Sequence, residues 1–157
     1  MKNKLKLGLH KPKRIILSNT ASGHHKHGCL SLKASADFTQ KYCFVTFHAD
    51  PGCIQLVNTN RLADGNAAIG VITDEAKTGE YLNVQVLNSN SGTCLIRTAA
   101  DVVQGQAITS NNAGLAIPVP GLAGGNTYFA YGVALQSVSA GELLEFTPTL
   151  GATVTLP

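Results

Sequence analysis

Two glutamates occupy equivalent places in the sequence and are its clearest candidates for acid–base chemistry. Glu80 and Glu142 each directly follow a glycine, Gly79 or Gly141, and lie sixty-two residues apart. Paired carboxylates can serve as general acid and general base when their surroundings separate their pKa values. No histidine or nucleophile recurs beside either copy, however, and a Glu after a turn glycine commonly caps a hairpin. We therefore expect both carboxylates to be structural, and we name no catalytic residue.

A second group of residues that could do chemistry is the histidine cluster just before Cys29, whose side chains are possible metal ligands. The imidazoles of His24, His25 and His27 and a thiol are suitable ligands for zinc or nickel. Binding needs deprotonated ligands held in a closed geometry, and a loop flanked by Ser and Gly supplies no such frame. We favour a solvated or partner-contacting loop over a metal site, and we expect no cofactor.

The cysteines indicate neither a zinc ribbon nor a thioredoxin-like site, because no two of them form a C-x-x-C pair. Nor does the sequence contain an apolar run long enough for a signal peptide or a membrane span. We therefore expect a protein that is not exported, with reduced and mostly buried thiols. The four cysteines are Cys29, Cys43, Cys53 and Cys94.

The segment from Gly70 to Glu80 resembles the third motif of trimeric dUTPases, in which Gly-Val-Ile-Asp precedes a Tyr and then Gly-Glu. Thr73 stands where that family has its Asp, no Tyr lies between Ile72 and Gly79, and the spacing is one residue longer. No Gly-rich phosphate-contacting segment is found, and no Gly-Lys-Ser/Thr follows the other glycines. The sequence therefore does not support dUTPase chemistry, and we expect no enzymatic activity.

The sequence contains an internal duplication, which predicts the strands and turns around Glu80 and Glu142. The stretch 68–87 recurs from Ala130 at one fixed offset, and the match extends to repeat units of about 36–87 and 100–150. Each copy predicts a short apolar strand, a small-residue connection closed by Gly-Glu, and a second strand in which apolar and polar residues alternate. We expect structural turns at the paired glycines, which are Gly70, Gly79, Gly132 and Gly141.

Composition favours a turn-rich β-protein over a helical bundle. The 157 residues include 16 Gly and no Trp, with 13% charged and 6% aromatic residues. We predict strands over residues 42–47 and 53–57, joined by a turn at Asp50-Pro51-Gly52. We predict a mainly β fold, a small barrel-like or sandwich-like domain over 36–157 built from two duplicated hairpin units, with an extended basic arm over 1–35.

Charge is divided between this arm and the body. Eight of the twelve Lys and Arg precede Ala36, where there is no Asp or Glu, so the remainder carries 4 − 9 = −5. We expect the arm to be extended when free and ordered on a partner, with an apolar run that can be buried there. The candidate partner-contacting residues are Lys2, Lys4, Lys6, Lys11, Lys13, Arg14, Ile15, Ile16 and Leu17.

Phrases in the second half resemble the capsid cement or decoration proteins of tailed bacteriophages over about 67–150. They are Val102-Val103-Gln104-Gly105-Gln106-Ala107-Ile108, Tyr131-Gly132-Val133-Ala134 and Ala140-Gly141-Glu142-Leu143-Leu144. The resemblance implies a non-enzymatic protein that binds the outside of the expanded head shell and resists internal pressure, often as a homotrimer. Its partner would be the major capsid protein, and it would be found on the virion surface after assembly in the host cytoplasm.

Physical arguments are compatible with this function and leave two alternatives. A symmetric oligomer covers exposed sheet edges, and a basic arm can lie across neighbouring subunits. The main alternative is a nucleic-acid-binding module that uses the arm, since Lys and Arg neutralise phosphates of any sequence. Against it, the arm lacks interleaved aromatic residues and the body is acidic. A dUTPase-like β-enzyme is third.

Overall fold

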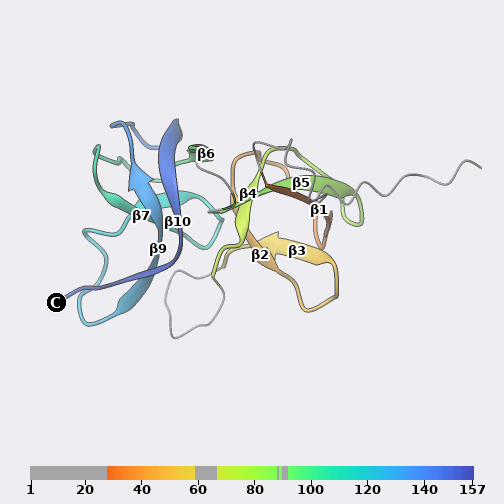
Figure 1. Ribbon diagram of the computed structural model, residues 1–157, viewed down its shortest axis with the longest axis horizontal. Helices are drawn as coiled ribbons and strands as arrows, with labels where there is room; N and C mark the ends of the chain where they lie inside the picture. The colour runs from red at the N-terminus through yellow and green to blue at the C-terminus, as the bar shows by residue number, and fades with distance from the viewer. Residues whose placement is uncertain (1–27, 59–66, 88, 90–91) are drawn as a thin grey trace, which may run out of the picture.

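Ten strands and no helix make up the computed structural model in the residues it describes, which are 28–58, 67–87, 89 and 92–157 (Figure 1). The first five strands are β1 (Cys29–Ala34), β2 (Phe44–Phe47), β3 (Cys53–Leu56), β4 (Gly70–Ile72) and β5 (Tyr81–Val86). The last five are β6 (Cys94–Arg97), β7 (Ala107–Ser110), β8 (Ala116–Pro118), β9 (Thr127–Ala134) and β10 (Leu143–Thr155). The predicted mainly β fold is confirmed.

The first five strands close into a barrel in the order β1-β3-β2-β4-β5. β1 completes it, because β1 pairs antiparallel with β5 from Cys29↔Gln85 to Lys33↔Tyr81 and parallel with β3 at Lys33↔Cys53. Closure leaves no free sheet edge among these strands. Their inward side chains form an apolar core that includes Val45, Ile54 and Val84.

This geometry corrects the boundary predicted for the arm. The range 1–35 was predicted to be extended and separate from the fold, yet Cys29–Ala34 is a strand with neighbours on both sides. By register Leu32, Lys33 and Ala34 correspond to Ile96, Arg97 and Thr98, so no identical residue marks this strand in the repeat. The arm therefore ends at or before His27, and residues 1–27 lie outside the described residues.

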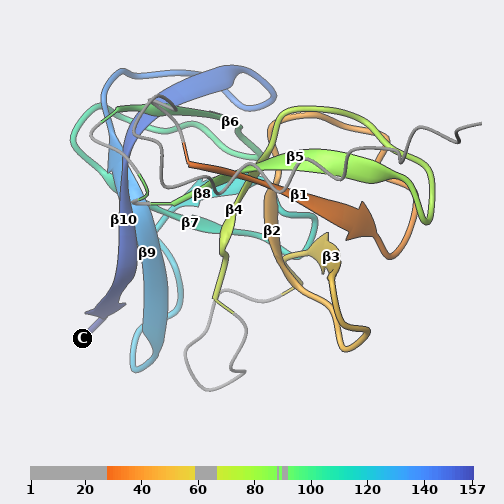
Figure 2. The same cartoon turned by 45° about the vertical axis from the view of Figure 1, so that its right-hand side comes forward.

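The last five strands form a second sheet with the order β6-β10-β9-β7-β8 (Figure 2). Each pairing of the barrel has a counterpart here: β6 with β10, β10 with β9, β9 with β7, and β7 with β8. The parallel contact that closes the barrel corresponds to one isolated parallel bridge, Thr98↔Ala116. The two halves of the chain thus share one strand plan.

Phe44 joins the barrel to the second sheet. Its side chain is fully buried, with ring centroids 4.8 Å from Tyr131 and 5.8 Å from Phe146. Its N–H donates to the carbonyl oxygen of Gly114 at 2.7 Å. Gly114 has a φ of 73° and an added Cβ would meet the Phe44 carbonyl oxygen, so the close approach requires glycine. The two halves consequently share one core cluster.

The four glycines predicted at turns divide into two kinds. Gly79 and Gly141 have φ values of 82° and 86°, a region that favours glycine, and nothing lies near an added Cβ. Gly70 and Gly132 are not turn residues, which corrects the prediction for this pair: they lie inside β4 and β9. There an added Cβ would collide with backbone oxygen and a side chain of the adjacent strand, so glycine permits close strand packing.

We predict that Gly79→Ala and Gly141→Ala each lower the free energy of unfolding by about 1 kcal/mol through backbone strain. Gly132→Ala should cost more, about 1–3 kcal/mol, because it adds a collision inside the sheet. Denaturant unfolding of the three variants measures this. Near-zero losses at both Gly79 and Gly141 would contradict the strain argument.

We also predict that Phe44→Ala lowers the free energy of unfolding by about 3–5 kcal/mol, since it empties the junction between the two sheets. Phe47→Ala is the matched control, because Phe47 lies in the same strand and is 55% exposed. Its effect should be within about 0.5 kcal/mol. Similar losses for the two variants would show that Phe44 does not hold the junction.

Candidate functional site

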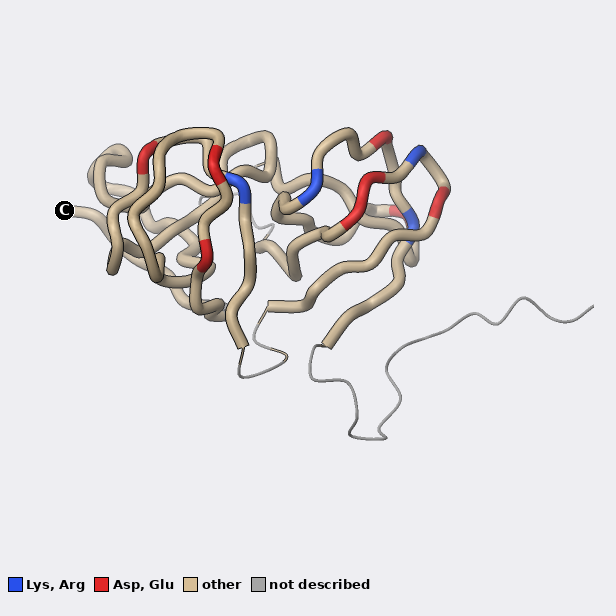
Figure 3. The backbone as a smooth tube through the Cα atoms, turned by 90° about the horizontal axis from the view of Figure 1, so that it is seen from above, with Lys and Arg blue, Asp and Glu red and all other residues tan. Residues whose placement is uncertain are grey.

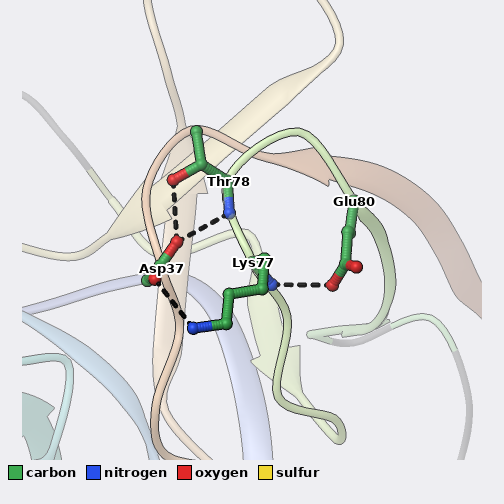
Figure 4. Close-up of polar contacts among 4 residues, drawn as sticks. All are labelled: Asp37, Lys77, Thr78 and Glu80. Carbon is green, nitrogen blue, oxygen red and sulfur yellow. Dashed lines mark hydrogen bonds and ion pairs between the residues drawn. The ribbon is translucent and has the colours of Figure 1, made fainter.

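The candidate acid–base residue Glu80 lies in a turn whose polar groups are bound to one another (Figure 4). The Glu80 carboxylate accepts the backbone N–H of Lys77 at 2.8 Å. The Asp37 carboxylate accepts both the backbone N–H and the hydroxyl of Thr78, at 2.8 and 2.9 Å, and its second oxygen lies 3.3 Å from the Lys77 ammonium. Each carboxylate therefore stabilises the turn that leads into β5.

Hydrogen bonding shifts the ionisation of Asp37. The pKa of its carboxyl is lowered, first by the backbone N–H of Thr78, then by the Thr78 hydroxyl and by Lys77, because these donors favour the charged form. A carboxylate held ionised in this way is a poor proton donor near neutral pH. Asp37 is thus suited to capping a turn and unsuited to acid catalysis.

The second sheet repeats this turn. The Glu142 carboxylate accepts the Ser139 N–H at 2.9 Å, and the Asp101 carboxylate accepts the Ala140 N–H at 2.9 Å. Glu80 and Glu142 thus serve separate turns in separate sheets and are not brought into one pair. The two repeat units begin with Ala36-Asp37 and Ala100-Asp101, so the aspartates are equivalent in sequence, but the sequence did not reveal that both side chains cap the turn of their own repeat unit.

A shallow hollow of about 250 Å³ lies beside the first of these turns. The hollow is lined by Asp37, Phe38, Thr39, Glu75, Ala76, Lys77 and Glu80. No histidine, cysteine or serine is among these residues, so the hollow holds no Ser-His or Cys-His pair.

No disulfide joins the four cysteines, all of which lie in the described part of the chain, and two of them are buried. Burial raises the pKa values of Cys43 and Cys94 to about 11, so both are protonated at neutral pH and poorly reactive. Cys29 and Cys53 are partly exposed. Within 28–58, 67–87, 89 and 92–157, no three His, Cys, Asp or Glu side chains gather as metal ligands. The cluster of His24, His25 and His27 lies outside the described residues.

The predicted partner-contacting residues, from Lys2 to Leu17, also lie outside the described residues. The part of the chain that is described carries four Lys and Arg against eight Asp and Glu, a balance of 4 − 8 = −4. Figure 3 shows that these basic residues lie on separate stretches of the backbone, with acidic residues between them. No helix in this part of the chain is long and apolar enough to cross a membrane.

Comparison with known proteins yields a structural match. No protein-family model matches the chain, and no curated protein sequence matches it significantly. The fold is similar to that in "The crystal structure of head fiber gp8.5 N base in bacteriophage phi29", with a TM-score of 0.60 and 14% sequence identity. The match covers 78% of this chain and 93% of that chain, so the arrangement of both sheets together belongs to a fold already seen in a solved structure.

We predict that Asp37→Ala lowers the melting temperature near neutral pH and that this deficit disappears in acid. A lowered folded-state pKa contributes stability that is present above the unfolded pKa of about 3.9 and lost as the pH falls through the folded value. Thermal unfolding between pH 7 and pH 2 measures it, with Glu75→Gln as a control that removes a charge from the same hollow. An undiminished deficit at the lowest pH would contradict the assignment.

Proposed function

We propose that this chain is a structural protein of a bacteriophage head that binds the outside of the capsid shell and stabilises it. The observation that carries the proposal is the fold match to the head fiber base, which spans 93% of that chain. The resemblance of 67–150 to cement and decoration proteins supports it independently, since it rests on sequence phrases and not on the fold.

The described surface is compatible with a non-enzymatic role. The carboxylates that sequence analysis singled out cap turns. A barrel without free edges joined to a second sheet through a buried aromatic cluster suits a protein that bears load. These features support a mechanical function.

The proposed partner is the major capsid protein, and the arm is the proposed contact. Its cations would meet carboxylates of the shell, gaining affinity through many weak contacts and by becoming ordered on binding. A homotrimer on the virion surface, formed after assembly in the host cytoplasm, is the arrangement that the sequence resemblance implies.

We predict that the chain co-sediments with empty expanded shells as well as with DNA-filled ones. Replacing Lys2, Lys4, Lys6 and Lys11 by Gln should weaken shell binding about tenfold or more, whereas replacing the same residues by Arg should preserve it, because charge is kept. The full chain is the right starting point, since removal of residues up to Lys33 would delete most of β1.

A nucleic-acid function predicts the opposite pattern. Shell binding would be equal for the Gln and Arg variants, and only the Arg variant would bind DNA of any sequence. That DNA affinity would fall with salt at a log–log slope of about −0.9 per phosphate neutralised. This outcome would overturn the proposed contact between the arm and the shell.

A further inference from the structure

The outer face of β6, β10 and β9 exposes four large apolar side chains. Leu95 is 40% exposed, Val133 41%, Leu135 39% and Leu143 36%. Strand register brings them together around Glu145: Leu95 pairs opposite Glu145 on one side, and the Leu135 N–H donates to the Glu145 carbonyl oxygen on the other. Val133 and Leu143 follow on the same face, two residues along their strands. We name these four side chains and Glu145 the apolar face.

The duplication shows that the fold does not require leucine at two of these positions. In the barrel, Ser31 pairs opposite Asn83, and the Thr73 N–H donates to the Asn83 carbonyl oxygen. By register, Ser31 corresponds to Leu95, Thr73 to Leu135 and Asn83 to Glu145. The side chains on both sides of Asn83 are therefore polar in the barrel, whereas those on both sides of Glu145 are leucines; the other two apolar residues have apolar counterparts, Tyr81 for Leu143 and Val71 for Val133. An exposed cluster that the fold does not need indicates a binding surface.

The face also specifies the charge of its occupant. Glu145 is half-buried among the leucines, and its carboxylate accepts the hydroxyl of Thr93. A carboxylate that becomes further buried on binding needs a cation to pair with. The occupant should therefore be an apolar segment with an adjacent Lys or Arg.

We propose that residues 13–17 of the same chain, Lys13-Arg14-Ile15-Ile16-Leu17, dock on the apolar face. In an extended segment Lys13, Ile15 and Leu17 point the same way, so the side of the segment that offers two aliphatic side chains to Leu95 and Leu135 also carries a cation for Glu145. In this segment two cations directly precede the run of three consecutive aliphatic residues in the arm.

The chain enters the described structure close enough for this contact. The carbonyl oxygen of Gly28 accepts the N–H of Val86 and the hydroxyl of Ser89, at the start of the connection from β5 to β6. Cys29 acts electrostatically on Cys94, the first residue of β6. The ten residues 18–27 can span up to about 33–36 Å, which is enough to reach the neighbouring strands.

Tethering favours the same chain as the source of the segment. Ten residues join 13–17 to the described structure, and a segment tethered over so short a distance is presented to its own chain at an effective concentration of the order of millimolar. A two-fold contact between the apolar faces of two copies would bring one Glu145 toward the other, which is unfavourable, and the nearby Arg97 already donates to the Gly141 carbonyl oxygen. Docking would also fix the place on the domain from which the segment Lys2 to Lys11 extends toward a shell. Only this consequence rests on the proposed function.

Trypsin cleavage of the full chain tests the docking without any shell. Cleavage after Arg14 should be about tenfold or more slower than cleavage after Lys6 or Lys26 in the same molecule, because a docked segment must first detach. Leu95→Ser with Leu135→Thr, the residues that the barrel itself carries, should remove this protection. Val103→Ser is the matched control, since Val103 is 56% exposed outside the apolar face.

A second variant tests the contribution of the Glu145 charge separately from that of the leucines. Glu145→Asn, matching Asn83, leaves the leucines in place and should speed cleavage after Arg14 about two- to fivefold at low salt and by less at high salt. It keeps the test decisive if the double variant folds poorly.

Three results would each overturn the proposal. The first is equal cleavage after Arg14 and Lys6 in the unmodified chain. The second is protection that survives both the double variant and Glu145→Asn. The third is protection that disappears on dilution, because that would assign the segment to the apolar face of a neighbouring copy.

Discussion

The burial of Phe44 between the barrel and the second sheet makes this duplicated chain one asymmetric molecule. Phe44 pairs with the fully buried Val71 in the barrel, and the equivalent pair in the second sheet is Ala107 and Val133. Val133 remains 41% exposed. The two units thus pack through surfaces that are not equivalent, and the surface around Val133 remains open to solvent.

Polar side chains serve the same turn in both units. Asp37 and Glu80 satisfy backbone N–H groups before β5, and Asp101 and Glu142 do so before β10. A carboxylate that accepts backbone N–H groups of its own repeat unit is held in place by the turn that it caps. The two repeat units thus share a tight turn that is capped by an Asp and a Glu.

The proposed phage-head function and the inferred docking of 13–17 concern different parts of the molecule and are independent of each other. The first rests on a fold shared with a head fiber base and on sequence phrases in 67–150. The second rests on the contrast between Ser31 and Leu95, and between Thr73 and Leu135, at equivalent positions of two sheets. Together they describe a rigid body from which a basic arm would leave at one defined place.

The sequence alone determined the β class, the duplication and the positions of Gly79 and Gly141, because strand alternation and turn chemistry are local and repeat at a fixed offset. Tertiary structure decided what depends on contacts between distant residues. It made Cys29–Ala34 a barrel strand, and it placed Gly70 and Gly132 inside strands where a neighbouring strand forbids a side chain. It also decided which of two equivalent surfaces is buried by Phe44 and which exposes Leu95 and Leu135. Local pattern cannot distinguish these outcomes, since the same alternation suits either face of a sheet.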